Sequence, residues 1–260
     1  MTRKKYNILR RIRGFDYSEF RRGFKEELIT HLNTFNKDKI LMRIDDTIES
    51  IILAIITANT VDRRIISLIY FPHGYKSRIT RDLERISSYL DTTLITIDPS
   101  TIVSSLESYV KGLVNIAKGE LYDDVIGLIL RKYADEEGYF ILGEYTRTSW
   151  MLGGFNEGYI KSVDYLPLSR VYYSQLRYIA RELRSMPLIR KARNNSMIEK
   201  LLKRLKITDE VVDGVIYGIE HGYTDHEISV ELDIDENAVF EIRRLVNDNY
   251  LRRNRPLAMY

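Results

Sequence analysis

The chain has 260 residues, 44% of them hydrophobic, and its 40 Lys and Arg side chains nearly balance 37 Asp and Glu side chains. A chain of this length can bury a core without cross-links, and it fits one large domain or one domain with a small appendage. The sequence contains no cysteine, which excludes disulfides, zinc–thiolate sites, iron–sulfur clusters and thiol nucleophiles. The net charge of +3 is too small to indicate nucleic-acid or membrane binding by itself.

The hydropathy pattern shows neither a membrane span nor an export signal. The longest apolar run, residues 51–58, is much shorter than the roughly 18 residues that a membrane span requires. The basic residues 1–5 are not followed by an apolar signal segment. We therefore expect a cytoplasmic protein without membrane contact, and the 19 tyrosines against 8 phenylalanines weakly favour a heat-adapted, thermophile source.

The first 25 residues carry nine basic side chains against two acidic ones. This charge predicts a solvated, partly frayed arm over residues 1–17, followed by a helix near residues 18–33. Blocks of like charge can also contact phosphate-rich partners. A nucleic-acid-associated protein that uses its basic termini, here and at residues 252–255, therefore stays open as an alternative.

From residue 39 onward, short apolar runs alternate with amphipathic segments. Strands are predicted at residues 39–44, 65–71, 93–97 and 139–142, and helices at residues 48–56, 77–90 and 101–134, the last with a weak point at Gly112. Strands that alternate with helices of this length form parallel βαβ units. The predicted fold class is α/β, with a Rossmann-like parallel sheet that carries helices on both faces.

The sequence after the fourth strand has a different pattern. It contains a Gly-rich segment at residues 153–158, an extended piece at 164–168, an amphipathic helix at 172–184 and a basic linker at 187–196, before further helices. The expected organisation is a basic N-terminal arm (1–17), an α/β domain (18–196) and a helical C-terminal extension (197–260) that packs on the same domain.

The turn after the first strand is the expected ligand position, because such sheets bind ligands beyond the carboxyl ends of their strands. Residues 45–50 of this turn are Asp-Asp-Thr-Ile-Glu-Ser. A phosphate-binding turn needs backbone N–H groups that point inward, which favours glycine and disfavours a carboxylate in the cradle. The segment contains no glycine and begins with two adjacent acids.

The segment from residue 142 to residue 183 resembles the ammonia-dependent NAD synthetase family, a branch of the N-type ATP pyrophosphatases. It contains Leu-Gly at 142–143, Leu-Gly-Gly-Phe at 152–155, Leu-Pro-Leu at 166–168 and Gln-Leu-Arg-Tyr-Ile-Ala-Arg-Glu-Leu at 175–183. Their order is similar to that of the GTGN turn, glycine-rich loop, LPI segment and QVRELAREL helix of the family. The resemblance extends from about residue 18 to the basic end of the chain and implies the fold of the family.

The ATP-binding signature of that family, Ser-Gly-Gly-x-Asp-Ser, falls on the turn after the first strand. Only Ser50 is kept, and Glu49 is a longer carboxylate where the family has Asp. Asp46 and Thr47 replace the two glycines, and Asp45 adds a charge of the same sign as the ligand. Two like charges about 4 Å apart repel by ~4 kcal/mol at an effective dielectric constant near 20. We therefore expect ATP binding to be disfavoured.

Other positions of the family pattern also lack the residues with which the family binds ATP or its metal ion. Ser149 falls where the family has a metal-binding Glu, and Glu144 replaces the threonine of the GTGN turn. The degenerate nucleotide-binding positions that the resemblance implies are Asp45, Asp46, Thr47, Glu49, Ser50, Gly143, Glu144, Thr146 and Tyr173, and the candidates for the dinucleotide side are Asp123, Asp124 and Glu157. We assign no catalytic residue and no metal ligand.

The resemblance leaves two opposed functions. The leading hypothesis is a catalytically degenerate NAD synthetase homologue, a pseudoenzyme retained as a dimeric binding or assembly protein. The alternative is an active enzyme of NAD biosynthesis that amidates deamido-NAD with ammonia, for which ATP, Mg2+ and deamido-NAD are the required ligands. The resemblance also implies that the long helices form a homodimer, or a heterodimer with an intact relative.

Overall fold

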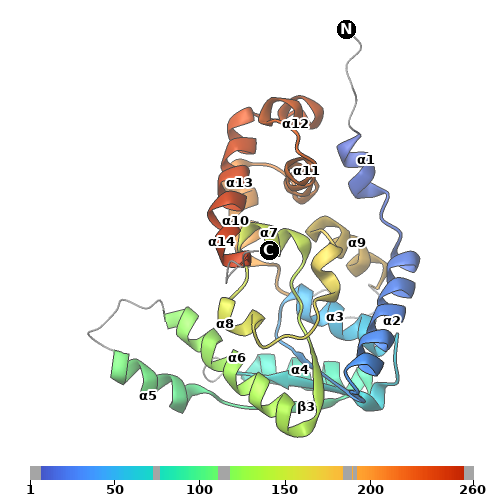
Figure 1. Cartoon of the computed structure of the whole chain (residues 1–260), viewed down its shortest axis with the longest axis vertical. Helices are drawn as coiled ribbons and strands as arrows, with labels where there is room; N and C mark the ends of the chain where they lie inside the picture. Colours follow the sequence, from blue (N-terminus) through green and yellow to red (C-terminus); the bar gives the residue numbers. More distant parts are fainter. Residues whose placement is uncertain (1–6, 73–76, 111–117, 184–188, 190–191, 255–260) are drawn as a thin grey trace.

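A four-stranded parallel sheet lies in the lower half of the molecule as drawn in Figure 1. The computed structural model describes residues 7–72, 77–110, 118–183, 189 and 192–254. The strands are β1 (Lys39–Arg43), β2 (Ile66–Tyr70), β3 (Thr93–Thr96) and β4 (Tyr139–Leu142), in the order β3-β2-β1-β4. Met42 of β1 stands opposite Leu68 of β2 and Leu142 of β4. The predicted α/β fold with a parallel sheet is confirmed.

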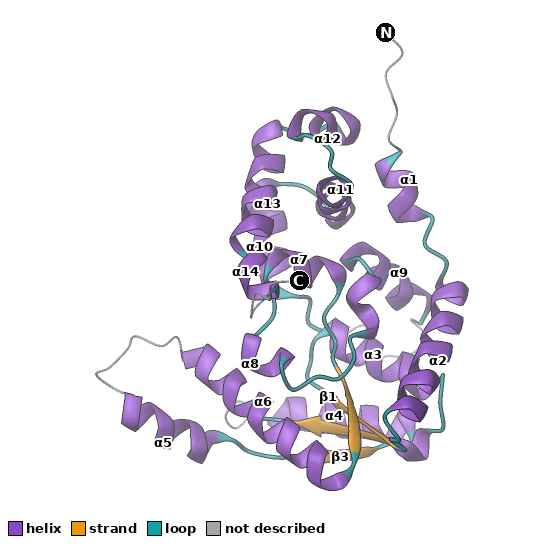
Figure 2. Cartoon of the chain, in the orientation of Figure 1, coloured by secondary structure: helices purple, strands orange, loops and turns teal. Residues whose placement is uncertain are grey.

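Helices cover both faces of the sheet (Figure 2). One face packs against α2 (Tyr17–Thr34), α3 (Ile48–Ala58), α4 (Ser77–Leu90) and α9 (Tyr173–Glu182), and the other packs against α5 (Ser100–Val110), α6 (Lys118–Glu137) and α8 (Glu157–Ile160). Successive strand residues point to opposite faces. Ile40 and Met42 therefore enter the first core, whereas Leu41 enters the second.

The strand order places the ends of β1 and β4 side by side. From β1 the chain moves to β2 and β3 on one side, and it returns through α5 and α6 to place β4 on the other side of β1. This reversal is the topological switch point, at which open α/β sheets leave a crevice beyond the carboxyl ends of their strands. The segments that follow β1 and β4 therefore face each other across this crevice.

The C-terminal helices form a third apolar core above the sheet (Figures 1 and 2). They are α10 (Ser196–Leu205), α11 (Asp209–Glu220), α12 (Asp225–Leu232), α13 (Glu236–Asp248) and α14 (Tyr250–Arg253). Of these, α11, α13 and α14 pack on α7 (Arg147–Leu152). The buried Asp213 of α11 accepts hydrogen bonds from Thr148 Oγ1 at 2.6 Å and Ser174 N at 2.8 Å. This carboxylate joins α11 to α7 and to the start of α9.

The predicted solvated arm is wrong over residues 8–13, which form helix α1 (Ile8–Arg13). Ile8 and Ile12 are buried, and Ile8 belongs to the C-terminal core. Gln175 of α9 also donates its side-chain N–H to the Ile12 carbonyl at 2.9 Å. The two isoleucines are four residues apart and so share one helix face, while the arginines between them point elsewhere. Residues 1–6 lie outside the described residues.

Three further expectations need correction. The helix predicted at 101–134 is two helices, α5 and α6, and Gly112 lies outside the described residues. Tyr165 of the predicted extended piece forms an isolated β-bridge with Leu142. The end of that piece is not extended, since Pro167–Arg170 forms a 3-10 turn (η2). Proline is tolerated at the first position of such a turn because that position needs no backbone N–H. Part of the irregular Gly-rich segment is the short helix α8. Within the described part of the chain, no helix has the length and apolar character of a membrane span.

Candidate functional site

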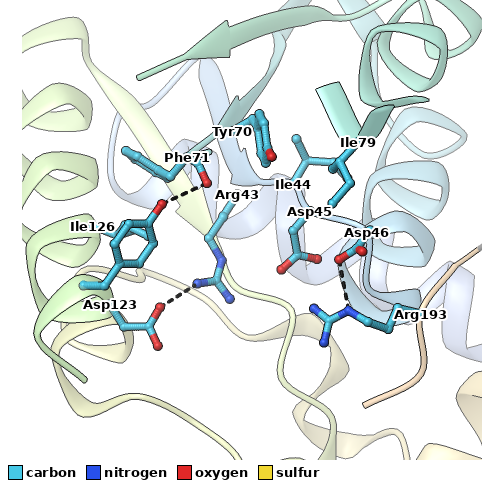
Figure 3. A pocket seen from close by; sticks show the side chains of 11 residues that line it. Arg43, Ile44, Asp45, Asp46, Tyr70, Phe71, Ile79, Asp123, Ile126 and Arg193 are labelled. Carbon is cyan, nitrogen blue, oxygen red and sulfur yellow. Dashed lines mark hydrogen bonds and ion pairs between the residues drawn. The ribbon is translucent and has the colours of Figure 1, made fainter. Parts of the chain in front are cut away.

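Two adjoining cavities of about 480 Å³ each lie at the carboxyl ends of β1 and β4. They share Arg43, Asp45 and Asp123 in their walls. Figure 3 shows the first cavity, which Tyr70, Phe71 and Ile79 close on its apolar side. The second cavity extends toward α7 and the C-terminal helices and is completed by Thr47, Glu49, Glu144, Tyr145, Gly153, Gly154, Phe155, Asn156, Asn195 and Arg252.

Arg43, the last residue of β1, forms an ion pair with the carboxylate of Glu144. Its Nε donates to Glu144 Oε1 at 3.0 Å, and a terminal guanidinium nitrogen contacts the same oxygen. The other Glu144 oxygen accepts the Tyr159 hydroxyl at 2.6 Å, and the Arg43 guanidinium lies 4.1 Å from the centroid of the Tyr159 ring. Asp123 of α6 stands farther away, at 3.8 Å from the guanidinium. Arg43 is therefore neutralised by this chain before any ligand arrives.

The carboxylate of Asp45 occupies the turn between β1 and α3. Its Oδ1 accepts the Thr47 N–H at 2.7 Å and the Ser50 hydroxyl at 2.8 Å, and it also contacts the Thr47 hydroxyl. Burial alone would raise the pKa of Asp45, but the charge of Arg43 and these hydrogen bonds lower it below its ordinary value. An ionised side chain thus takes the donors that a phosphate-binding turn directs at its ligand.

The segment around Arg193 is hydrogen-bonded to the N-terminal end of α3. Ile48 is the first residue of α3, so its N–H is one of the donors that an α-helix leaves free. This N–H donates to the Arg193 carbonyl at 2.9 Å, and the Arg193 N–H donates to the Asp46 carbonyl at 2.6 Å. The Arg193 side chain pairs with the Asp46 carboxylate at 3.1 Å (Figure 3). The predicted basic linker therefore includes a cap on the helix expected to bind phosphate.

Glu49 is a buried carboxylate with one satisfied oxygen. Its Oε1 accepts the Asn195 side-chain N–H at 3.0 Å, whereas its buried Oε2 has no hydrogen-bond partner among the residues that the structure describes. Only 4% of the residue is exposed, and it forms part of the wall of the second cavity. Burial raises the pKa of Glu49 to about 7, because the hydrogen bond from Asn195 offsets only part of the desolvation and the nearby Asp45 and Glu144 oppose ionisation.

The structure brings six of the predicted site residues into the cavity walls: Asp45, Asp46, Thr47, Glu49, Asp123 and Glu144. Ser50 lies behind them and bonds to Asp45. Tyr173 is buried on the far side of Asn195, whose N–H its hydroxyl accepts at 3.2 Å. These residues form one acidic region.

The remaining predicted site residues do not line the two cavities. Gly143 permits close packing, because a Cβ there would lie 2.7 Å from Leu166 Cδ2. Thr146 caps α7 by accepting the Ser149 N–H at 3.2 Å. Asp124 is exposed on α6, and Glu157 accepts the Arg252 Nε–H at 3.0 Å. The structure therefore does not bring this set together at one ligand position.

Sequence reasoning missed Arg43, Arg193, Asn195 and Arg252. Arg43 had a local signal, since it is a charged residue in an otherwise apolar run at the ligand edge. Arg252 had none, because its partners Glu157 and Phe155 are nearly a hundred residues away. Arg252 and Arg253 both donate to backbone carbonyls of this chain, so these two members of the predicted basic terminus are not free for nucleic acid.

The cavity walls do not fit the ATP and Mg2+ that the family resemblance implies. Two N–H donors at the start of α3, those of Thr47 and Ile48, are already used, and each arginine of the described walls has a carboxylate partner. Across the described ranges, no three Asp, Glu or His side chains stand close enough to hold a metal ion. We therefore derive no reaction step through either group.

A family model and individual known proteins both match this chain over nearly its full length. Residues 23–256 match the family model described as NAD synthase. The NH3-dependent NAD+ synthetase of Thermococcus sibiricus is 23% identical over 95% of this chain and 98% of its own length. Among solved structures, the NH3-dependent NAD synthetase of Campylobacter jejuni has a TM-score of 0.78 at 12% identity, covering 95% of this chain and 100% of that chain. The NMN synthetase of Francisella tularensis has a TM-score of 0.75 at 15% identity, covering 95% and 98%. The chain belongs to the NAD synthase family.

Proposed function

We propose that this protein is a catalytically degenerate member of its family, a pseudoenzyme retained as a dimeric binding or assembly protein. The observation that carries the proposal is the position of the Asp45 carboxylate. Asp45 Oδ1 accepts the Thr47 N–H and the Ser50 hydroxyl, so the turn after β1 holds an anion that belongs to the chain. A phosphate that entered this turn would have to displace that carboxylate and would be repelled by its charge.

The charge pairing of the cavity walls supports the same conclusion. Three arginines lie in the described walls, and each has its own carboxylate: Arg43 with Glu144, Arg193 with Asp46, and Arg252 with Glu157. A triphosphate would therefore compete with three existing ion pairs for its positive partners. A repulsion of about 4 kcal/mol from a single unpaired carboxylate corresponds to roughly a thousandfold loss of affinity.

Titration calorimetry with ATP·Mg2+, deamido-NAD and NAD, together with an ammonia-dependent assay for NAD formation, tests the proposal. We expect no binding of ATP at millimolar concentration and no NAD formation above the rate without protein. An active NH3-dependent NAD synthetase assayed in parallel controls for the substrates. Measurable turnover by this chain would overturn the proposal.

An active NAD synthetase is the second candidate function. Its support is the similarity to NH3-dependent NAD+ synthetases over nearly the full length of the chain. This function requires ATP to displace Asp45 from the turn and Arg193 from the start of α3. The calorimetric titration separates the two candidates, since only the second predicts saturable ATP binding.

The dimeric part of the proposal is supported by an apolar surface on α5 and α6, which project from the body in Figure 1. Ile102, Leu106 and Tyr109 follow a helical spacing on α5 and are exposed, Tyr109 to 81%. Leu128 of α6 is 59% exposed. A second copy of the chain would remove this apolar surface from water.

We expect a dimer in light scattering after gel filtration, and a monomer for the double variant Tyr109→Glu, Leu128→Glu. The double variant Tyr89→Glu, Tyr250→Glu changes two exposed aromatic residues elsewhere and should stay dimeric. A wild-type monomer at micromolar concentration would contradict the homodimer. A dimer that forms only after an intact relative is added would instead identify the heterodimer.

A further inference from the structure

The first two helices carry exposed basic side chains that have no carboxylate partner in the described part of the chain. Helices α1 and α2 follow each other along one side of the molecule (Figures 1 and 2). The exposed cations without such a partner are Arg10 and Arg11 on α1 and Arg21, Arg22 and Lys25 on α2. Arg13 differs from them, since it pairs with Glu210 of α11 at 2.7 Å.

The acidic side chains of α2 and its N-cap do not neutralise these cations. Asp16 accepts two backbone N–H groups at the start of α2, and Glu27 pairs with Arg170 at 3.1 Å. Glu19 and Glu26 are exposed on α2. Five basic side chains therefore stand against two acidic ones, and this surface of the described chain is positively charged.

A cavity on α1 adds a second observation. Arg10 and Arg11 line this cavity of about 430 Å³ together with Asn7 and Gly14. Guanidinium groups present planar sets of N–H donors that match the oxygens of a phosphate group. The cavity is larger than a phosphate, so a phosphate could enter it and contact both arginines. The first helix thus offers an anion site that is separate from the two cavities at the sheet.

The apolar residues of this surface distinguish between kinds of anionic partner. Ile8 and Ile12 of α1 are buried, so α1 has no apolar face left to insert into a membrane surface. Phe15, Tyr17 and Phe20, which lie in the sequence between the two groups of cations, pack against the core. Single strands bind by stacking their bases on exposed rings. A duplex, which presents its phosphates outward, suits the surface better.

We propose that α1 and the first half of α2 bind the sugar–phosphate backbone of a nucleic-acid duplex, with one phosphate between Arg10 and Arg11. Contacts of this kind depend on charge and carry no information about base sequence. The inference goes beyond the proposed function and does not rest on the loss of the ATP site, because none of the five cations lines the two cavities at the sheet.

Fluorescence anisotropy of the full-length protein, with a labelled DNA duplex of about 20 base pairs as the probe, tests the proposal at several salt concentrations. Five phosphate contacts predict that the logarithm of the association constant falls against the logarithm of the salt concentration with a slope of about −4.5. We expect saturable binding and equal affinity for duplexes of unrelated sequence.

The double variant Arg10→Gln, Arg11→Gln should bind at least tenfold more weakly at about 100 mM salt, and its slope should be smaller in magnitude by about 2. The double variant Arg22→Gln, Lys25→Gln gives a second reading on the other helix and should reduce the slope by a similar amount. Both pairs are exposed, so the fold should be unaffected.

The double variant Arg64→Gln, Arg85→Gln is the matched control. It removes the same charge at two exposed arginines elsewhere in the chain, each of which pairs with an aspartate. Its affinity for the duplex should stay within about twofold of the wild type, since paired arginines away from the surface contribute little. Equal weakening by the control and by Arg10→Gln, Arg11→Gln would show general charge attraction and overturn the site.

The other outcomes are equally decisive. No duplex binding at about 50 mM salt, or an affinity independent of salt, overturns the proposal. Binding to phosphatidylserine vesicles or to a single strand of thymidines, without binding to the duplex, would replace the partner and also overturn it. ATP·Mg2+ binding or NAD formation would overturn the pseudoenzyme and leave this inference standing.

Discussion

Asp213 and Glu49 are both buried carboxylates, but their surroundings differ. Both Asp213 oxygens accept hydrogen bonds, one from Thr148 and one from Ser174, and they join α11 to α7 and α9. Within the described part of the chain, Glu49 has one oxygen without a hydrogen-bond partner, and the residue forms part of the wall of the second cavity. The two residues are similarly buried, so the difference between them lies in how completely their carboxylate oxygens are hydrogen-bonded.

The pKa values of the two carboxyl groups follow from the same contrast. Burial raises the pKa of Asp213 to about 6, because hydrogen bonds from Ser174 and Thr148 offset part of the desolvation. Burial raises the pKa of Glu49 to about 7, because hydrogen bonds from Asn195 and from its own backbone offset only part of the desolvation, and the nearby Asp45 and Glu144 oppose ionisation. In both cases the folded state binds protons more tightly than the unfolded chain, so ionisation lowers stability.

Replacing Glu49 by Gln should give the largest change in stability. The folded pKa of about 7 lies above the ordinary value of 4.5. The stability of the wild type should therefore fall as pH rises from about 4.5 to 7, and an upper estimate of the loss is about 3 kcal/mol. Glu49→Gln removes this loss, so it should stabilise the protein at pH 8 and change little at pH 4.5.

Urea unfolding of both proteins at the two pH values measures the difference. The Glu241→Gln variant, at a partly exposed position on α13, should show the same pH dependence as the wild type, because the ion pair of Glu241 with Arg204 is open to solvent. A Glu49→Gln stability curve parallel to that of the wild type between pH 4.5 and 8 would contradict the account of Glu49 as an incompletely satisfied carboxylate.

Replacing Asp213 by Ala should destabilise the protein at acidic pH, whereas Glu49→Gln should stabilise it at pH 8. At pH 5 the Asp213 carboxyl is mainly protonated and keeps its partners. Its removal leaves the Thr148 hydroxyl and the Ser174 N–H without the oxygens to which they donate, and it opens a small cavity. We expect a loss of about 2 kcal/mol in the free energy of unfolding. Asp248→Ala, at an exposed position on α13, should change it by less than about 0.5 kcal/mol. Equal effects would show that Asp213 does not join the helices.

The fold was predictable because its signals are local. The apolar run at Tyr139–Leu142 and the amphipathic pattern at Ser77–Leu90 each predict the observed element with the same bounds. Alternating strands and helices then leave few topologies, since parallel connections are short and right-handed. Helix α1 escaped prediction because its two isoleucines among arginines show an apolar face only once α11 is present to cover it.

The site was predictable only in part, because the charged residues that pair with each other in it are far apart in the sequence. The turn at Asp45 could be located from the end of β1, and its acids could be read directly. The contact of Arg193 with Asp46 joins residues 147 positions apart, and that of Arg43 with Glu144 joins residues 101 positions apart. No spacing or periodicity encodes such pairs, so the charge balance of the walls required the structure.

The third carboxylate, Asp45, extends the comparison, since its Oδ1 accepts several hydrogen bonds from the chain while the residue lines the cavities at the ligand edge, as Glu49 does. Asp45→Ser removes the internal anion and leaves the hydroxyl that the family signature carries at this position. The Thr47 N–H and the Ser50 hydroxyl then become available to a phosphate. We expect the affinity for ATP·Mg2+, measured by calorimetry, to rise at least tenfold, which corresponds to about 1.4 kcal/mol.

Asp124→Ser is the control for Asp45→Ser, because it removes the same charge at an exposed position outside the cavities and should leave ATP binding undetectable. An unchanged affinity in Asp45→Ser would mean that Asp45 is not the barrier. The cap on α3 would then be the stronger obstacle, since the Arg193 carbonyl keeps the Ile48 N–H in this variant. A tenfold gain would instead show that the carboxylate in the turn opposes ATP, and that the cap alone does not exclude it.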